Sequence, residues 1–347
     1  MAREALITGN QPGPPEEKHR DDALRPRRLD EVIGQKQTVE RLRIAIKACR
    51  KLKESLGHIL FDGPPGLGKT TFATVLPNEL ETSIQITSGP ALTRPADLLP
   101  YLTNAKEGSI IFIDEIHRTP RVVEEYLYSA MEDFRLGIPI GEGMNARTVY
   151  MKLNRFTLIG ATTRSGMLTG PMRDRFKHHE HLDFYTLDEL ATIVTINAGK
   201  LKTPILPEAA REIAHRSRGT PRIANSRLWW VRNYATSEAN GTIDLPLAQA
   251  ALQMAEVDKE GLDKQDRRYL DVLTGVFGGG PAGVEALAAT LSLAADTLSD
   301  EVEPYLLRAE FIIRSPRGRM ATAKAYQHLG KTVPVNADEQ TQRSLFQ

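Results

Sequence analysis

The fold of this chain is decided by residues 58–76, which read HILFDGPPGLGKTTFATVL. The apolar run before the glycines predicts a strand, and the apolar spacing after Thr70 predicts a helix. Gly66 and Gly68 allow backbone N–H groups to close around phosphate oxygens, and Lys69 adds positive charge at the β- and γ-phosphates. The Thr70 hydroxyl, at the start of the helix, is a ligand for Mg²⁺. A strand, a glycine-rich loop and a helix in this order predict a site for ATP and Mg²⁺.

A second strand carries acidic residues at its end. In the predicted strand 109–113 every residue after Ser109 is apolar, and Asp114, 45 positions after Lys69 (114 − 69), and Glu115 follow directly. Open α/β sheets bind their ligands at the carboxyl ends of the strands. We expect Asp114 to hold the water shell of Mg²⁺ and Glu115 to polarise the attacking water. Alone, such a pair is more often a solvated loop, but with the glycine-rich loop it predicts hydrolysis of ATP.

Composition limits the class of protein. The chain has 347 residues, of which 41% are hydrophobic and 26% charged, as in soluble globular proteins of two or three domains. No apolar run approaches the ~20 residues of a membrane helix, and the N-terminus lacks the pattern of a signal peptide. The single cysteine, Cys49, has helical spacing and is most simply a small core residue. We therefore expect a cytoplasmic protein with no membrane partner.

The distribution of charge is more informative than its sum. The formal net charge is only +1. Residues 308–324, however, contain five basic side chains and one acidic side chain, Glu310. A basic patch on a neutral protein predicts contact with a polyanion. The basic residues are Arg308, Arg314, Arg317, Arg319 and Lys324.

The first half of the chain alternates short β-rich runs with helical stretches. This alternation predicts a parallel sheet covered by helices on both faces, an α/β unit over residues 21–185. Residues 1–20 show no periodicity and are expected to be a flexible lead. The expected strands are 58–61, 83–87, 109–113, 156–161 and 181–184.

The second half is mainly helical. Helical spacing at 187–200, 207–218, 223–239 and 245–257 predicts a small helical domain over 186–258. A third unit, 259–331, shows three helical patterns, an apolar 311–313 and a Pro/Gly turn. This outline is typical of a winged helix. The three patterns are 266–276, 283–291 and 297–305, and residues 332–347 are expected to be a loose tail.

Three further features have both a functional and a plain structural interpretation. The apolar strand 156–161 ends in hydroxyl residues, which could sense the γ-phosphate or simply satisfy the strand end. Arg173 and Arg175 flank one aspartate, and an arginine supplied across a subunit boundary can accelerate hydrolysis by roughly 10³–10⁵. A surface ion pair is the alternative. Arg222, at the start of a helix, could report the nucleotide state or merely cap that helix.

The motifs together resemble those of AAA+ ATPases and, more narrowly, the RuvB family of bacterial Holliday-junction branch-migration motors. The resemblance extends over about residues 20–330. It rests on the segments 24–26, 32–35, 63–71, 112–118, 160–164, 173–176, 219–225, 277–281 and 317–322.

The resemblance implies an αβα ATPase domain, a helical lid and a winged-helix domain, assembled as a homo-hexameric ring around duplex DNA. It also implies work at Holliday junctions during recombination and repair, with a RuvA-like junction-binding protein and a RuvC-like resolvase. Thr162 matches the sensor position, and Arg175, with Arg173 as second choice, matches the arginine finger. The implied ATP-binding residues are Leu24, Arg25, Gly63, Gly66, Gly68, Lys69, Thr70, Thr71, Tyr185 and Arg222, with Glu132, Asp133 and Phe134 lining the same or an adjoining subunit's pocket. The implied DNA contacts are Arg314 and Arg319, and Arg317 lies in the same turn.

Residues 136–153 predict a projecting hairpin. Gly141-Glu142-Gly143 lies between two arms, and Val149, Met151 and Leu153 alternate with polar residues or Tyr150. The resemblance implies that this hairpin docks on the RuvA-like protein. The alternative is a hairpin packed on its own domain.

Several positions depart from the family pattern. They are Trp229-Trp230, Lys177 and the segment Thr119-Pro120-Arg121. Paired tryptophans on a lid helix favour packing over stacking on nucleic acid.

Two other functions are compatible with parts of this sequence. One is an initiator- or clamp-loader-like AAA+ switch, which need not translocate, and the other is a non-catalytic DNA-binding or scaffold protein with a relic nucleotide pocket.

Overall fold

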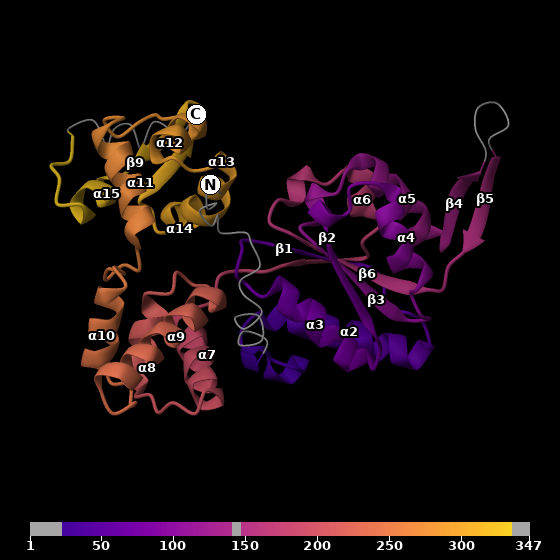
Figure 1. Cartoon of the computed structure of the whole chain (residues 1–347), viewed down its shortest axis with the longest axis horizontal. Coiled ribbons are helices and arrows are strands. Elements are labelled where there is room, and N and C mark those ends of the chain that lie inside the picture. The colour runs from indigo at the N-terminus through magenta and orange to yellow at the C-terminus, as the bar shows by residue number, and fades with distance from the viewer. Residues whose placement is uncertain (1–22, 141–146, 335–347) are drawn as a thin grey trace, which may run out of the picture.

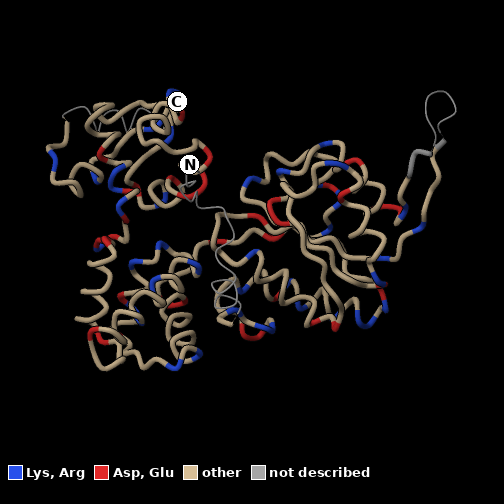
Figure 2. Tube along the Cα trace, in the orientation of Figure 1, with Lys and Arg blue, Asp and Glu red and all other residues tan. Residues whose placement is uncertain are grey.

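The computed structural model describes residues 23–140 and 147–334, which form three units (Figure 1). The first is an α/β unit, the second is helical, and the third combines helices with a two-stranded hairpin. Basic and acidic residues are interspersed along all three (Figure 2), in line with the small net charge. In the described part of the chain, no helix has both the length and the apolarity needed to cross a membrane.

The large unit is built on one parallel sheet of five strands in the order β2-β3-β6-β1-β7. The strands are β1 (Ile59–Asp62), β2 (Ile84–Ser88), β3 (Ser109–Asp114), β6 (Phe156–Thr162) and β7 (His178–His181). The helices are α2 (Lys36–Leu52), α3 (Lys69–Leu80), α4 (Pro95–Thr103), α5 (Arg121–Glu132) and α6 (Gly170–Asp174), with short 3₁₀ turns η1 (Leu29–Glu31), η2 (Gly89–Ala91), η3 (Ile116–Arg118) and η5 (Ser165–Met167). The predicted doubly covered parallel sheet is confirmed.

Strand β3, an inner strand of the sheet, contributes side chains to two cores, one on each face. Ile110 and Phe112 pack with α2 and α3, whereas Ile111 and Ile113 pack with α4 and α5. All four side chains are fully buried. A strand presents successive side chains to opposite faces, so an unbroken apolar run is what a sheet with helices on both faces requires.

The predicted strand 181–184 is wrong by three residues, whereas the other four lie within one residue of their predicted ranges. The observed strand β7 lies at the edge of the sheet and pairs only with β1, so it does not need apolar residues on both faces. Its buried residue, Glu180, is paired with Arg41 at 2.6 Å. The apolar Leu182 that suggested a strand lies just after β7 and is fully buried in the core.

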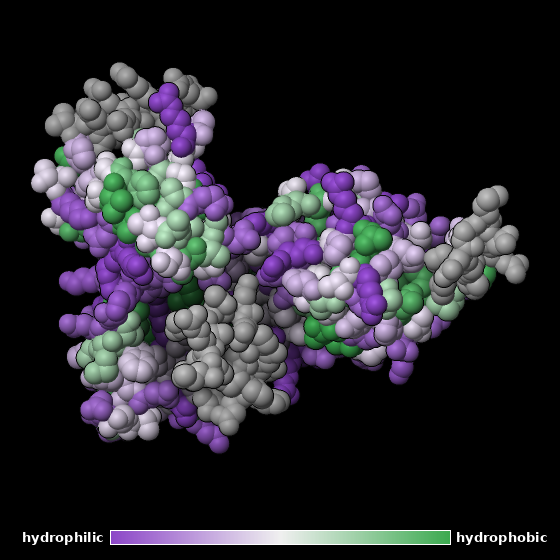
Figure 3. All heavy atoms as spheres, turned by 45° about the horizontal axis from the view of Figure 1, so that its top comes forward, coloured by the Kyte–Doolittle hydropathy of each residue, from purple (hydrophilic) through white to green (hydrophobic). Residues whose placement is uncertain are grey.

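The predicted hairpin is present as β4 (Arg135–Ile140) and β5 (Arg147–Lys152), and it extends from one end of the large unit (Figure 1). Its base is anchored, because Leu136 is 0% and Leu153 5% exposed. Farther out, Val149 is 46% and Tyr150 69% exposed. The space-filling view shows apolar surface at this end of the large unit (Figure 3). The hairpin is therefore packed on its own domain at its base and exposed at Val149 and Tyr150, while Gly141-Glu142-Gly143 lies outside the described residues.

The helical unit contains four helices, α7 (Leu187–Lys200), α8 (Pro207–His215), α9 (Pro221–Glu238) and α10 (Leu245–Met254). Helix α7 begins where predicted, with Thr186 and Glu189 forming a reciprocal capping box. Two helices end earlier than predicted, α8 at His215 rather than 218 and α10 at Met254 rather than 257. Arg218 and Glu256 have φ of 56°, which is incompatible with a continuing right-handed helix.

The paired tryptophans lie on α9 and contact their own helical unit, although Trp230 is 38% exposed. The Trp230 indole donates to the carbonyl of Ala251 on α10 at 2.6 Å. The Arg232 guanidinium lies 5.0 Å from the ring centre of Trp229. These contacts support the packing interpretation of both side chains.

The third unit has the predicted order of helices followed by a small hairpin. Its elements are α11 (Lys264–Gly275), α12 (Val284–Leu291), α13 (Ala295–Thr297), the π-helical turn η6 (Leu298–Val302), α14 (Glu303–Arg308), β8 (Ile312–Ser315), β9 (Gly318–Ala321) and α15 (Ala323–His328). The predicted helix 297–305 is thus a composite that runs from Ala295 to Arg308. The lead at 1–20 and most of the predicted tail lie outside the described residues.

Candidate functional site

The glycine-rich loop joins β1 to α3 at the carboxyl edge of the sheet. Two of its glycines are required by close approaches. Gly63 has φ +133°, and a Cβ there would lie 2.5 Å from the carbonyl oxygen of Leu182. Gly66 has φ +79°, and a Cβ there would lie 3.1 Å from the Cβ of Arg222. The loop ends at Gly68, where α3 begins and its unpaired N–H groups favour an anion.

Lys69 turns back onto the loop. Its ammonium donates to the carbonyls of Gly63 at 2.7 Å and Pro64 at 2.8 Å, and the residue is only 8% exposed. Burial lowers the pKa of Lys69 to about 8, although Asp114 and two other acids oppose that shift. A phosphate in the loop would offer this ammonium a charged acceptor in place of two neutral carbonyls.

Two oxygen donors meet beside the loop. The Thr70 hydroxyl donates to Oδ2 of Asp114 at 3.3 Å, while Oδ1 of Asp114 accepts from the Glu115 backbone N–H at 2.9 Å. Hydroxyl and carboxylate oxygens are the ligand types that Mg²⁺ prefers. No group of three or more His, Cys, Asp or Glu side chains suited to a metal occurs in the described residues. This donor set fits an ion that keeps water and substrate phosphates as its other ligands.

Glu115 is held in a strained conformation. Its φ is 48°, the left-handed region that costs a non-glycine residue of order 1 kcal/mol or more. Its carboxylate pairs with the Arg118 guanidinium at 3.0 Å, and both side chains are more than a third exposed. The carboxylate is therefore close to Asp114 and the loop, but it is engaged by a neighbouring cation.

The end of β6 lies beside the start of the loop. Thr162 pairs in register with Asp62, the residue that precedes Gly63. The Thr162 hydroxyl lies 2.9 Å from Nδ1 of His117 and accepts from the Arg164 backbone N–H at 2.9 Å. Burial lowers the pKa of His117, which favours its neutral form. The Thr162 hydroxyl at the end of β6 thus has hydrogen-bond partners, as the structural alternative predicted. It also lies next to the loop, as a sensor of the γ-phosphate requires.

The helical unit closes over the other side of the loop. The Tyr185 hydroxyl donates to the carbonyl of Leu67 at 3.3 Å, and the Arg222 N–H donates to that of Gly66 at 3.4 Å. Leu24 is 2% exposed, and its carbonyl accepts from Lys200 on α7 at 2.8 Å. Arg25 follows directly and is half-buried. The predicted ATP-binding residues of 63–71, Tyr185 and Arg222 are therefore brought to one place, and Leu24 contacts α7 of the same helical unit.

A second group of predicted residues lies elsewhere. Arg175 pairs with Glu132 at 2.8 Å, donates to the carbonyl of Pro171 at 2.7 Å and stacks 4.6 Å from the ring centre of Tyr128. Phe134 packs in the core beneath the hairpin. In the described part of the chain, no hydrogen bond or ion pair links the segment 132–134, Arg173 or Arg175 to the glycine-rich loop. The segment 132–134 was expected to line the ATP pocket of its own subunit or of an adjoining one. The structure does not support the first of these expectations.

Sequence reasoning assigned no role to Arg164, which joins the site to the third unit. Its guanidinium pairs with Asp296 at 2.8 Å and with Asp300 at 2.9 Å. A cavity of about 260 Å³ lies at this junction, between the loop, the ends of β6 and β7, and η6. The only available signal was that Arg164 directly follows the hydroxyl residues of β6.

The predicted DNA-contacting arginines lie on the wing hairpin. Arg314 and Arg319 face each other across β8 and β9, and both reach the buried carboxylate of Glu303. Arg317 is exposed in the turn between the strands. These three cations occupy one small hairpin, which is the arrangement that contact with a phosphate backbone requires.

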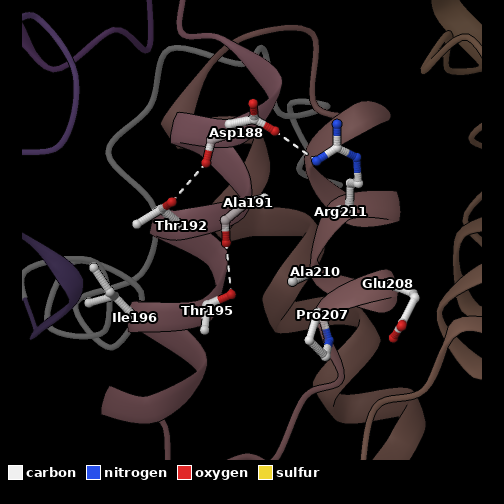
Figure 4. A pocket seen from close by; sticks show the side chains of 9 residues that line it. All are labelled: Asp188, Ala191, Thr192, Thr195, Ile196, Pro207, Glu208, Ala210 and Arg211. Carbon is white, nitrogen blue, oxygen red and sulfur yellow. Dashed lines mark hydrogen bonds and ion pairs between the residues drawn. The ribbon is translucent and has the colours of Figure 1, made fainter.

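The remaining departures have structural explanations. Lys177 packs over Gly57, where a Cβ would lie 2.9 Å from its Cδ. Thr119 is buried and its N–H donates to the carbonyl of Ile116, so Thr119 and Pro120 connect η3 to α5, which begins at Arg121. A larger open hollow of about 490 Å³ lies between α7 and α8, where Arg211 pairs with Asp188 at 2.7 Å (Figure 4). None of its lining residues belongs to the loop or the acidic pair.

Comparison with known proteins identifies each unit. Three family models match: the Holliday junction DNA helicase RuvB P-loop domain over residues 24–182, the RuvB AAA lid domain over 185–258 and the RuvB C-terminal winged helix domain over 259–330. The chain is 54% identical to the Holliday junction branch migration complex subunit RuvB of Rhodopirellula baltica, over 96% of this chain and 97% of that protein. It is 53% identical to the protein of the same name from Flavobacterium johnsoniae, over 91% and 93%. A solved structure of the Thermotoga maritima RuvB Holliday junction branch migration motor matches with a TM-score of 0.83 and 45% identity, over 90% of this chain and all of that one.

Proposed function

This chain belongs to the RuvB family, and we propose that it is the ATP-driven motor subunit of Holliday junction branch migration in recombination and repair. This function rests on one observation: the glycine-rich loop, the acidic pair and the end of β6 meet at one edge of the sheet. An ion pair of Arg164 with Asp296 joins this site directly to the third unit, which carries the basic wing hairpin. A motor requires that its hydrolysis site be linked to the domain that binds DNA.

Hydrolysis would proceed by positioning rather than by covalent chemistry. Thr70 and Asp114 would hold Mg²⁺, which when bound would neutralise charge on the phosphate oxygens. Lys69 would leave the carbonyls of Gly63 and Pro64 for the β- and γ-phosphates. Glu115 would orient the attacking water and draw off its proton, once its pair with Arg118 opens. Thr162 would sense the γ-phosphate from the adjacent strand.

The remaining ATP contacts would come from the segments that meet over the loop. They are Leu24, Arg25, Gly66, Gly68, Thr71, Tyr185 and Arg222. The short links from Tyr185 and Arg222 to the loop support this assignment, because nucleotide exchange would then move the helical unit. We also propose the domain limits 21–185, 186–258 and 259–331.

A ring would complete the site. Arg175 is proposed as the arginine finger, with Arg173 as second choice, acting on the nucleotide of an adjoining subunit in a homo-hexamer. The segment 132–134 would line that neighbour's pocket. The pairing of Arg175 with Glu132, away from the loop of its own subunit, supports action across a boundary.

Partners would bind at two other surfaces. Arg314, Arg317 and Arg319 would contact phosphates of duplex DNA without reading its sequence. The hairpin 136–153 would dock on a RuvA-like protein, and its exposed Val149 and Tyr150 support a protein contact. A RuvC-like resolvase would act in the same complex, in the cytoplasm.

Branch migration of synthetic four-way junctions tests this function. The purified chain, together with a RuvA-like protein, is expected to convert junctions into duplexes with ATP and not with a non-hydrolysable analogue. An AAA+ switch of the initiator or clamp-loader type would consume ATP and leave junctions intact. A relic pocket would release no phosphate at all. Either of these results would overturn the proposal.

A further inference from the structure

Glu303 is a buried acid beneath the wing hairpin. It is the first residue of α14, and its side chain is 0% exposed. Five hydrogen bonds converge on its two oxygens. Oε1 accepts from the Tyr269 hydroxyl at 3.1 Å and from Arg319 Nε at 2.9 Å, while Oε2 accepts from Arg314 Nε and Nη2 at 3.1 and 2.6 Å and from Arg319 Nη2 at 3.1 Å.

The carboxyl is ionised at neutral pH. Burial alone would raise the pKa of Glu303, but the hydrogen bonds from Arg319 and Arg314 hold it below its ordinary value. Burial and the charge of Glu303 raise the pKa of Tyr269, so its hydroxyl remains a donor. The cluster therefore contains one negative and two positive charges.

The network fixes the direction of both guanidinium groups. Arg314 and Arg319 are directly opposite each other on the hairpin. Each binds Glu303 through Nε and Nη2, and in the described residues neither Nη1 has a hydrogen-bond partner. The side chains are 48% and 17% exposed, whereas Glu303 has no exposed surface. One edge of each guanidinium is thus turned inward, and the Nη1 end is left available.

We propose that Glu303 is a positioning residue for nucleic-acid binding, which holds Arg314 and Arg319 with their Nη1 ends toward a phosphate backbone. The inference rests on the proposed function, because it takes both arginines as DNA contacts. Without Glu303, two like charges opposite each other on a hairpin would repel. Without Glu303, the side chains of Arg314 and Arg319 would also be mobile in the free protein. Their loss of rotamer freedom would then oppose DNA binding. Glu303 removes both costs beforehand, although it cancels one positive charge.

The test is Glu303→Gln in the full chain, with binding to a fluorescent duplex measured by anisotropy. We expect binding about three- to tenfold weaker at physiological salt, because immobilising two freed arginines outweighs the added charge. Glu310→Gln is the matched control. It changes the net charge of the same domain equally, and in the described residues the Glu310 carboxylate contacts no arginine. This control should bind as tightly as the parent or slightly more tightly.

A double-mutant cycle separates positioning from a merely structural role. In the Arg314→Ala/Arg319→Ala background, Glu303→Gln should leave the affinity for DNA unchanged. If Glu303→Gln unfolds the third unit in calorimetry, Tyr269→Phe, which removes one of the five bonds, should give a smaller loss of affinity through the same cycle. The inference is overturned if Glu303→Gln binds as tightly as Glu310→Gln, or if its loss of affinity persists without the two arginines. A parent chain that binds no DNA would overturn the proposed function as well.

Discussion

The nucleotide site and the wing hold their charged groups in opposite ways. At the nucleotide site, Lys69 contacts two neutral carbonyls, and the Glu115–Arg118 pair is more than a third exposed. In the wing, one fully buried carboxylate receives five hydrogen bonds. The exposed Glu115–Arg118 pair is worth little and exchanges readily, and the buried Lys69 ammonium can exchange its two carbonyls for a phosphate, which is a stronger acceptor. The buried Glu303 carboxylate, in contrast, cannot lose its two arginines without a large cost in free energy. We infer from this difference that the nucleotide site rearranges in each cycle of ATP hydrolysis, whereas the arginines of the wing keep one conformation.

The largest expected effect tests the rearranging region. Glu115→Gln should bind ATP normally and lose at least about 100-fold in hydrolysis, because a positioned base contributes roughly 10²–10⁴-fold. Phosphate release and binding of a fluorescent nucleotide measure the two steps. Arg118→Ala is the control, because it breaks the same ion pair and keeps the carboxylate, and it should remain active. Near-normal turnover of Glu115→Gln would remove Glu115 from its assigned role.

The next effect tests the rigid region. Arg314→Ala/Arg319→Ala should weaken DNA binding about 10- to 100-fold across sequences and lower the salt slope by about two, because two phosphate contacts are lost. Anisotropy titrations at several salt concentrations measure both quantities. Unchanged binding would place the DNA contact on another surface, and a loss confined to one sequence would contradict a backbone contact.

A pH dependence sharpens the difference between the two regions. Because burial lowers the pKa of Lys69 to about 8, the free protein loses this charge as the pH rises above that value. ATP binding would then require proton uptake, so the affinity should fall by up to about tenfold per pH unit between about 8 and 10. Calorimetric titration measures it. Lys69→Arg, whose side chain stays charged, should abolish this slope, and an ATP affinity of the parent that is constant over this range would contradict the prediction.

The smallest expected effect concerns the contact between the regions. Arg164→Ala breaks the pairs with Asp296 and Asp300, which join the segment after β6 to the third unit. Partly exposed pairs are worth about 0.5–1 kcal/mol, so the stimulation of hydrolysis by DNA should fall about two- to fivefold. Arg211→Ala is the control, because it breaks a pair of similar length inside the helical unit. An equal loss in both variants would mean that Arg164 has no special part in coupling.

Much of the fold could be predicted because its signals are local. The unbroken apolar run 110–113 predicts a strand that is covered on both faces, and Thr186 with Glu189 caps α7 from within three residues. The errors occurred where a distant partner decides the outcome. Strand β7 is polar because it lies at the sheet edge and Arg41 neutralises its Glu180, neither of which a local pattern contains.

The candidate site divides in the same way. The loop, Asp114 and Glu115 were predicted from spacing, because a phosphate needs glycines, a lysine and a helix start in immediate sequence. The pairs of Arg164 with Asp296 and Asp300 span more than 130 residues. The hydrogen bonds of Glu303 with Arg314 and Arg319 form only because the wing hairpin folds back over α14. Amino-acid order by itself determined the chemistry of this protein, because each motif is contiguous. Only the tertiary structure decided which charges meet, because pairing between distant residues depends on the packing of whole domains.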